Sequence, residues 1–118
     1  MLENTDFVVQ EGTVTIFAQA FEGQMGLRKI TIPASVNQIY TAAFKDAANL
    51  EEVNFLSNSE LDSIPINIFE GCSSLITINL PNTIKNISDY AFKNCNSLNT
   101  ISLPELLTNI PMSMFEGC

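Results

Sequence analysis

The sequence predicts a solenoid, in which short parallel β-strands from successive units stack into one continuous sheet. Two regularities predict this fold. A phenylalanine returns at a nearly constant interval with an isoleucine five residues before it, giving the pairs Ile16 and Phe21, Ile39 and Phe44, Ile64 and Phe69, Ile87 and Phe92, and Ile110 and Phe115. Strand-like segments with alternating apolar residues lie between these pairs. One such unit is too small to bury its own apolar face, whereas units stacked about 4.8 Å apart share a continuous core.

The strand-like segments share the template L-x-x-I-x-L-P. They read "LRKITIP" (27–33), "LEEVNFL" (50–56), "LITINLP" (75–81) and "LNTISLP" (98–104). Successive side chains of a strand point to opposite faces, so the apolar residues face a core and the intervening residues face water. Proline has no N–H for a strand ladder, and Pro33, Pro81 and Pro104 are therefore expected to end the pairing. Phe7 and Val9 fit the same template, which puts a first strand near the N-terminus.

The repeats divide a single domain, residues 1–118, into about five rungs. We place a first rung at 7–26, full repeats at 27–49, 50–74 and 75–97, and a truncated repeat at 98–118. The second full repeat departs from the template, with Leu56 in place of the proline and two extra residues around "SNSEL" (57–61). Terminal repeats of solenoids usually carry a polar capping segment, and none follows the last repeat. We therefore expect the chain to be a fragment of a longer protein.

A turn is expected after each phenylalanine. The residues two positions later are Gly23, Asp46, Gly71, Asn94 and Gly117. All of these residue types tolerate a positive φ. The pattern predicts short helical turns that close in a left-handed conformation.

The residue next to each phenylalanine alternates in charge. It is Glu22, Lys45, Glu70, Lys93 or Glu116. If the repeats stack, unlike charges become neighbours, and each exposed pair contributes at most a few tenths of a kcal/mol. The alternation is an independent indication that the repeats stack.

The three cysteines belong to the repeat. Three residues after the phenylalanines, the chain holds Gln24, Ala47, Cys72, Cys95 and Cys118. Alanine can replace a small buried residue but not a metal ligand, so the position is interpreted as core packing. A zinc site would need closely spaced Cys or His, and the chain has no CxxC and no His. Stacking would also bring neighbouring cysteines close enough for a disulfide, although three cysteines leave one unpaired. We predict buried thiols, no metal site and no cofactor.

Composition excludes several classes of function. The 118 residues are 46% hydrophobic and 15% charged, which favours one folded domain over disorder. The net charge of −8, with five scattered Lys and Arg, argues against nucleic-acid binding. No apolar run approaches the roughly 20 residues of a membrane span. Without His there is no imidazole base for a Ser or Cys nucleophile, and no glycine-rich phosphate loop is present. We therefore expect no enzymatic activity and no membrane insertion.

The repeat resembles a known family. The segment "LITINLPNTIKNISDYAFKNC" (75–95) is similar to the leucine-rich repeat of the BspA-like, Treponema-type family, and the resemblance extends over 14–118, or over 7–118 when the first strand is included. It implies a leucine-rich repeat solenoid that forms a right-handed curved coil. It also implies kinship with surface proteins of bacteria and parasitic protists that are associated with adhesion and host-protein binding.

On this resemblance we expect a non-catalytic protein-binding module of a cell-surface adhesion or host-recognition protein, located at the cell surface or secreted. The opening "MLENTDFVVQEG" carries no export signal. The alternative is a cytoplasmic leucine-rich repeat scaffold or regulator of another protein. The sequence identifies neither the organism nor the partner protein.

The solvent face of the sheet is the predicted binding surface, as on the concave side of other solenoids. It presents two rows, Asp6, Lys29, Glu52, Thr77 and Thr100 in the first and Val8, Thr31, Asn54, Asn79 and Ser102 in the second. Our candidates for protein binding are Lys29, Thr31, Glu52, Asn54, Thr77, Asn79, Thr100 and Ser102. These rows could equally be an ordinary soluble β-surface. Tyr40 and Tyr90 are alternative anchors on another side of the coil, because hot spots favour Trp, Tyr and Arg.

The last repeat is expected to leave one apolar side uncovered. That side comprises Leu98, Ile101, Leu103, Leu107, Ile110 and Phe115. Uncovered apolar side chains beside a free strand edge favour association. A two-fold contact closes on itself, so we predict a homodimer through this rung.

Overall fold

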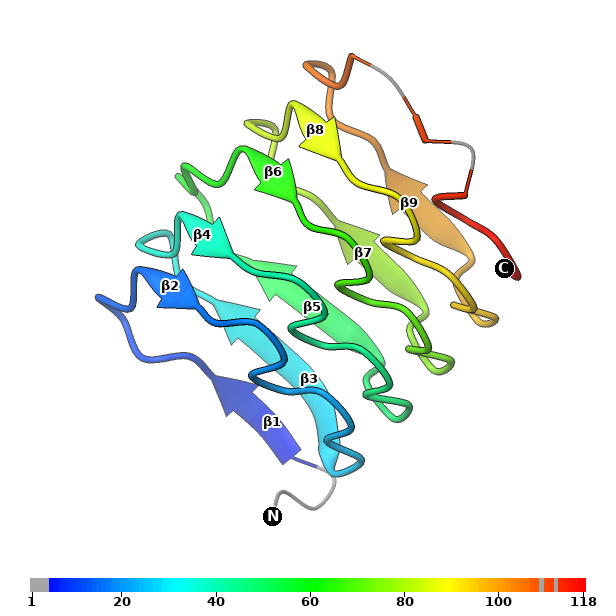
Figure 1. Ribbon diagram of the computed structural model, residues 1–118. Coiled ribbons are helices and arrows are strands. Elements are labelled where there is room, and N and C mark those ends of the chain that lie inside the picture. The colour runs from blue at the N-terminus through cyan, green and yellow to red at the C-terminus, as the bar shows by residue number, and fades with distance from the viewer. Residues whose placement is uncertain (1–4, 109, 112) are drawn as a thin grey trace.

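The computed structural model describes residues 5–108, 110, 111 and 113–118 and shows a solenoid with one long parallel sheet (Figure 1). The sheet has the order β1-β3-β5-β7-β9. Its strands are β1 (Thr5–Val8), β3 (Leu27–Ile32), β5 (Glu52–Phe55), β7 (Thr77–Asn79) and β9 (Thr100–Ser102). Every pair is parallel. The predicted solenoid of parallel strands is confirmed.

The strand register follows the sequence repeat. Ile30 pairs with Val53, Val53 with Ile78, and Ile78 with Ile101. In β3, burial is strongest at the template positions Leu27, Ile30 and Ile32. One face of the sheet therefore lies on the core and the other faces water, as strand geometry requires.

A second side of the coil carries two-residue strands. They are β2 (Thr15–Ile16), β4 (Gln38–Ile39), β6 (Ser63–Ile64) and β8 (Asn86–Ile87). β2 pairs with β4 and β6 with β8, but no pairing joins β4 to β6. The residue after β4 and the residue after β8 each donate their N–H to the preceding rung, Tyr40 to Ile16 and Ser88 to Ile64. Pro65 holds the equivalent place after β6 and has no N–H, so the ladder is interrupted there.

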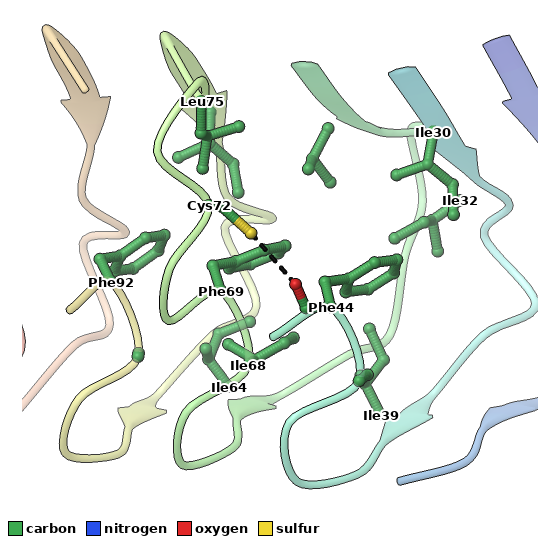
Figure 2. Packing of buried hydrophobic residues seen from close by; sticks show 14 of the residues in the cluster. Ile30, Ile32, Ile39, Phe44, Ile64, Ile68, Phe69, Cys72, Leu75 and Phe92 are labelled. Atoms are coloured by element: carbon green, nitrogen blue, oxygen red, sulfur yellow. Dashed lines mark hydrogen bonds between the residues drawn. The ribbon is translucent and has the colours of Figure 1, made fainter. Parts of the chain in front are cut away.

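A ladder of phenylalanines runs through the core (Figure 2). The rings of Phe21, Phe44, Phe69, Phe92 and Phe115 stack in sequence, with centroids 5.2, 5.4, 5.5 and 5.8 Å apart. Phe44, Phe69 and Phe92 are fully buried. Burying one such side chain contributes roughly 1.5–3 kcal/mol, and offset stacking adds about 0.5–1.5 kcal/mol per pair. The phenylalanine that recurs in each repeat of the sequence therefore stacks on its counterpart in the next rung.

The turns after each phenylalanine have the predicted left-handed residues. The φ angles of Gly23, Asp46 and Gly71 are 71°, 59° and 78°, and those of Asn94 and Gly117 are 61° and 78°. A second left-handed position occurs two residues before the phenylalanine, with φ of 59° at Ala42 and 61° at Tyr90. Neither Ala nor Tyr marks such a conformation in a sequence, because both adopt it at a cost of about 1–2 kcal/mol.

The expectation of helical turns is wrong for the described residues, where these segments are consecutive hydrogen-bonded turns. Alternate N–H groups bond within the turn and across to the next rung. The N–H of Gln24 donates to Phe21 O within its turn, whereas the N–H of Gly23 donates to Lys45 O one rung away. Half of the donors are thus committed to the neighbouring rung, and the left-handed residues break the helical path.

The alternating charges lie in one column, but they do not pair. The N–H of Asp46 donates to Glu70 O, and the N–H of Gly71 donates to Lys93 O, so the backbones stack in register. None of the three ion pairs formed by the described residues belongs to this column. Glu22 instead accepts from Gln19 Nε2, and Lys93 lies 5.1 Å from the ring centroid of Tyr90. Asn67 likewise donates to Glu70, so three of the five charges, Glu22, Glu70 and Lys93, interact within their own turn.

Candidate protein-binding face

The two polar rows lie side by side on the solvent face of the long sheet. In the first row Lys29 pairs with Glu52, and Glu52 with Thr77. In the second row Asn54 pairs with Thr31 and with Asn79. The structure therefore brings together all eight residues predicted for protein binding, in adjacent rungs of the long sheet.

Side chains at the N-terminal end of this face bind one another. Arg28 Nη2 lies 2.6 Å from Asp6 Oδ1, Arg28 Nη1 lies 3.7 Å from Glu51 Oε1, and Lys29 Nζ lies 3.3 Å from Glu52 Oε2. All five side chains are substantially exposed to solvent, so each pair contributes about 0–1 kcal/mol. Their main effect is that the charged side chains of β1 and β3, and those of Glu51 and Glu52, are already paired within the protein.

The C-terminal end of the face is different. Five of its polar side chains are exposed and have no hydrogen-bond or ion-pair partner in the described part of the chain: Asn54, Thr77, Asn79, Thr100 and Ser102. Asparagine offers two donors and one acceptor oxygen, and each hydroxyl offers both functions. We call these five residues the open polar patch. A ligand can use their hydrogen-bonding groups without displacing an internal partner.

The alternative anchors lie on another side of the coil. Tyr40 is 47% exposed and stacks on Phe17, which is 70% exposed, with ring centroids 6.5 Å apart. Sequence reasoning missed Phe17, although it follows Ile16 as Tyr40 follows Ile39. Tyr90 is half-buried beneath Lys93. The structure therefore separates the two tyrosines and gives only Tyr40 an exposed aromatic neighbour.

The residues expected at the open apolar side belong to the last repeat, whose strand β9 is an edge of the long sheet. Leu103 and Ile110 are 39% and 54% exposed. The other four are partly buried against the core: Leu98, Ile101, Leu107 and Phe115. Leu106, which was not predicted, is 52% exposed next to them. Self-association through this side stays a prediction.

The thiols line the inside of the coil. Cys72 Sγ donates to Phe44 O at 3.1 Å and Cys95 Sγ to Phe69 O at 3.2 Å, as Figure 2 shows for Cys72. Both residues are fully buried, as predicted, and all three cysteines are free. Burial raises the pKa of Cys72 well above its ordinary value and that of Cys95 to about 12. A thiolate is the reactive form, so these two thiols are inert at neutral pH.

Two further searches cover only residues 5–108, 110, 111 and 113–118. No cluster of three or more His, Cys, Asp or Glu in these residues has the arrangement of a metal site. No helix in these residues has the length and apolar character that would cross a membrane.

Comparison with known proteins gives the family. The model of the BspA type leucine-rich repeat region matches residues 2–118 in six copies. A leucine-rich cell surface protein of Faecalibacterium prausnitzii is 34% identical, with a TM-score of 0.91 over 98% of this chain and 30% of its own. A leucine-rich repeat protein of Eubacterium ventriosum is 27% identical, with a TM-score of 0.68 over 92% of this chain and 35% of its own.

The pneumococcal vaccine antigen PcpA shares the fold, with a TM-score of 0.75 at 20% identity over 89% of this chain and 30% of its own. No curated protein was found to match the chain. The chain spans about a third of the length of these solved structures. The repeat pattern, the stacked parallel strands and these matches lead to one conclusion: the chain belongs to the BspA-type leucine-rich repeat family.

Proposed function

We propose that the chain is a non-catalytic protein-binding module of a cell-surface adhesion or host-recognition protein. The open polar patch carries this proposal. It places five unpartnered polar side chains on one rigid sheet, whereas the charged end of the same face is already paired internally. The similarity to bacterial cell-surface proteins supports the location.

The sheet makes the patch well suited to a protein ligand. Its backbone groups are fixed by pairing between rungs, so little conformational entropy is lost when a partner binds. Ile76 is 45% exposed and directly precedes Thr77, which adds an apolar contact beside the amides and hydroxyls. We expect the partner to bury Ile76 and to hydrogen-bond to Asn54 and Asn79.

Matched variants test the proposal. The immobilised native protein should capture a ligand from a mixture of purified extracellular-matrix proteins. The double variant Asn54→Arg and Asn79→Arg should no longer capture it. The control is Asn37→Arg and Asn86→Arg, which adds the same charge at two exposed asparagines on the side of the short strands. If the first variant still captures the ligand and the control does not, the proposed site is wrong and the ligand binds on the side of Phe17 and Tyr40.

A further inference from the structure

The two extra residues of the second full repeat contribute to a loop, and a cleft lies beside this loop. The cleft has a volume of about 370 Å³ and is lined by residues 55–59 and 79–83. It therefore lies between the chain that leaves β5 and the chain that leaves β7 (Figure 1). Ligand pockets in proteins span roughly 300–1,000 Å³, so the cleft has room for one small ring.

The neighbouring rung holds the loop in place. Thr83 Oγ1 donates to Leu61 O at 2.5 Å, and the N–H of Leu61 donates to Ser59 Oγ at 3.2 Å. Asn58 turns the chain with a φ of 69°. Because these contacts fix the wall of the cleft, a ligand would not have to order the loop when it binds.

Three amide side chains line the cleft without an internal partner. Asn58 lies in the loop, Asn79 ends β7, and Asn82 follows two residues after Leu80. No hydrogen bond is found for any of these three side chains among the described residues. Each amide can donate and accept at once, which is the capacity needed to bind a hydroxyl group.

The rest of the lining is neutral and mixes apolar residues with the hydroxyls of Ser57, Ser59 and Thr83. Phe55 is half-buried and Leu56 is 44% exposed, and both belong to the lining. No charged side chain lines the cleft, so a charged ligand would find no partner there. A ring with apolar C–H faces and a rim of hydroxyl groups matches an apolar wall and several amides. An extended peptide matches less well, because β5 and β7 already pair with each other and leave no free strand edge for it.

We propose that this cleft binds a neutral hexopyranose unit of a glycan. The amides of Asn58, Asn79 and Asn82 bind its hydroxyl groups, and Leu56 contacts its C–H face. Asn79 also belongs to the open polar patch, so the cleft continues the sheet face toward the loop. The sugar site goes beyond the proposed protein binding and does not depend on it.

Nuclear magnetic resonance titration of the native protein tests the proposal. The probes are the methyl glycosides of glucose, galactose, mannose and N-acetylglucosamine, each at millimolar concentration. At least one should shift the resonances of 55–59 and 79–83 with saturation. Asn58→Gly, which keeps the left-handed backbone, and Asn82→Ala should each bind about tenfold more weakly, as expected for about 1.4 kcal/mol per lost hydrogen bond.

Asn37→Ala is the control, because it removes an exposed amide far along the chain from the cleft. It should bind like the native protein. The proposal is overturned if none of the four sugars shifts these resonances, or if the Asn58 and Asn82 variants bind as tightly as the control. It is also overturned if a neutral extended peptide, alanylalanylalanine with blocked ends, saturates the cleft and the sugars do not.

Discussion

The side chain of Asp46 occupies the space that a Cβ at Gly71 would need. A Cβ built at Gly71 would collide with Asp46 Oδ1 and lie 3.2 Å from its Cγ. Two rungs further along, the side chain of Asn94 occupies the space beside Gly117 in the same way. The alternation of glycine with Asp or Asn is therefore a packing rule between rungs, in which the side chain of one rung fills the place left by the glycine of the next.

Gly71→Ala should destabilise the protein more than Gly23→Ala. Both alanines must adopt the left-handed conformation, with φ near 78° and 71°, at a cost of about 1–2 kcal/mol. Only Gly71 also meets a side chain, since nothing lies within 4 Å of a Cβ at Gly23. Urea unfolding of the two variants gives the difference in the free energy of unfolding.

A double variant separates the two causes. Asp46→Gly removes the obstructing carboxylate and keeps a residue that tolerates positive φ. Combined with Gly71→Ala, it should recover the excess loss and leave only the backbone cost. If the double variant is simply the sum of the two single variants, the packing rule between Asp46 and Gly71 is wrong.

Thiol labelling should distinguish the three cysteines. Cys118 is exposed, whereas Cys72 and Cys95 are fully buried. In native protein, an aromatic disulfide reagent should therefore label Cys118 quickly. It should label Cys72 and Cys95 only as fast as local unfolding exposes them. Mass spectrometry of the labelled peptides measures the three rates. Equal rates without unfolding would contradict the burial of Cys72 and Cys95.

Replacing Cys95 with Ala should cost about 1–2 kcal/mol of stability, because it leaves a small cavity and removes the hydrogen bond to Phe69 O. Ala47 already occupies the same position of its own repeat and is fully buried, so the fold should survive. Unfolding in urea measures the loss. Bound zinc in stoichiometric amount, found by elemental analysis of native protein, would overturn the packing role.

Stability should fall as the pH rises from about 9 toward 12. Burial raises the pKa of the Cys95 thiol from its ordinary value of 9.0 to about 12, and raises that of Cys72 as well. Between these values the unfolded chain loses thiol protons that the folded chain keeps, so the free energy of unfolding decreases with pH. The double variant Cys72→Ala and Cys95→Ala should show a shallower decrease. Equal slopes in the two proteins would contradict this origin.

The side of β9 should mediate a homodimer. Leu103, Leu106 and Ile110 are exposed in the last repeat, whose β9 is an edge strand, and Leu98 and Ile101 border a hollow with Phe115. Light scattering at micromolar concentration should give twice the monomer mass. Leu103→Lys together with Ile110→Lys should give a monomer, and Met25→Lys, at an exposed residue of the first rung, should not. A native monomer would contradict the prediction.

The sequence by itself determined the stacking of the repeats. The isoleucine and phenylalanine pairs placed the core ladder, and the template fixed the register that joins Lys29 to Glu52 and Asn54 to Asn79. The cysteine position and the left-handed residues after each phenylalanine were also predicted. These features follow from periodicity, because a side chain that recurs at one position must meet its own copy in the next rung.

Only the tertiary structure decided how neighbouring rungs share their contacts. The sequence predicted that unlike charges would be neighbours along the column, but Glu22 and Lys93 interact within their own turns, because the turns place Gln19 beside Glu22 and Tyr90 beside Lys93. The left-handed conformation at Ala42 and the cleft beside Asn58 also escaped prediction. The N–H of Ala42 donates to Ile66 O of the next rung, and the cleft lies between loops of two rungs. A repeat pattern gives the spacing of the rungs without giving these contacts between their turns and loops.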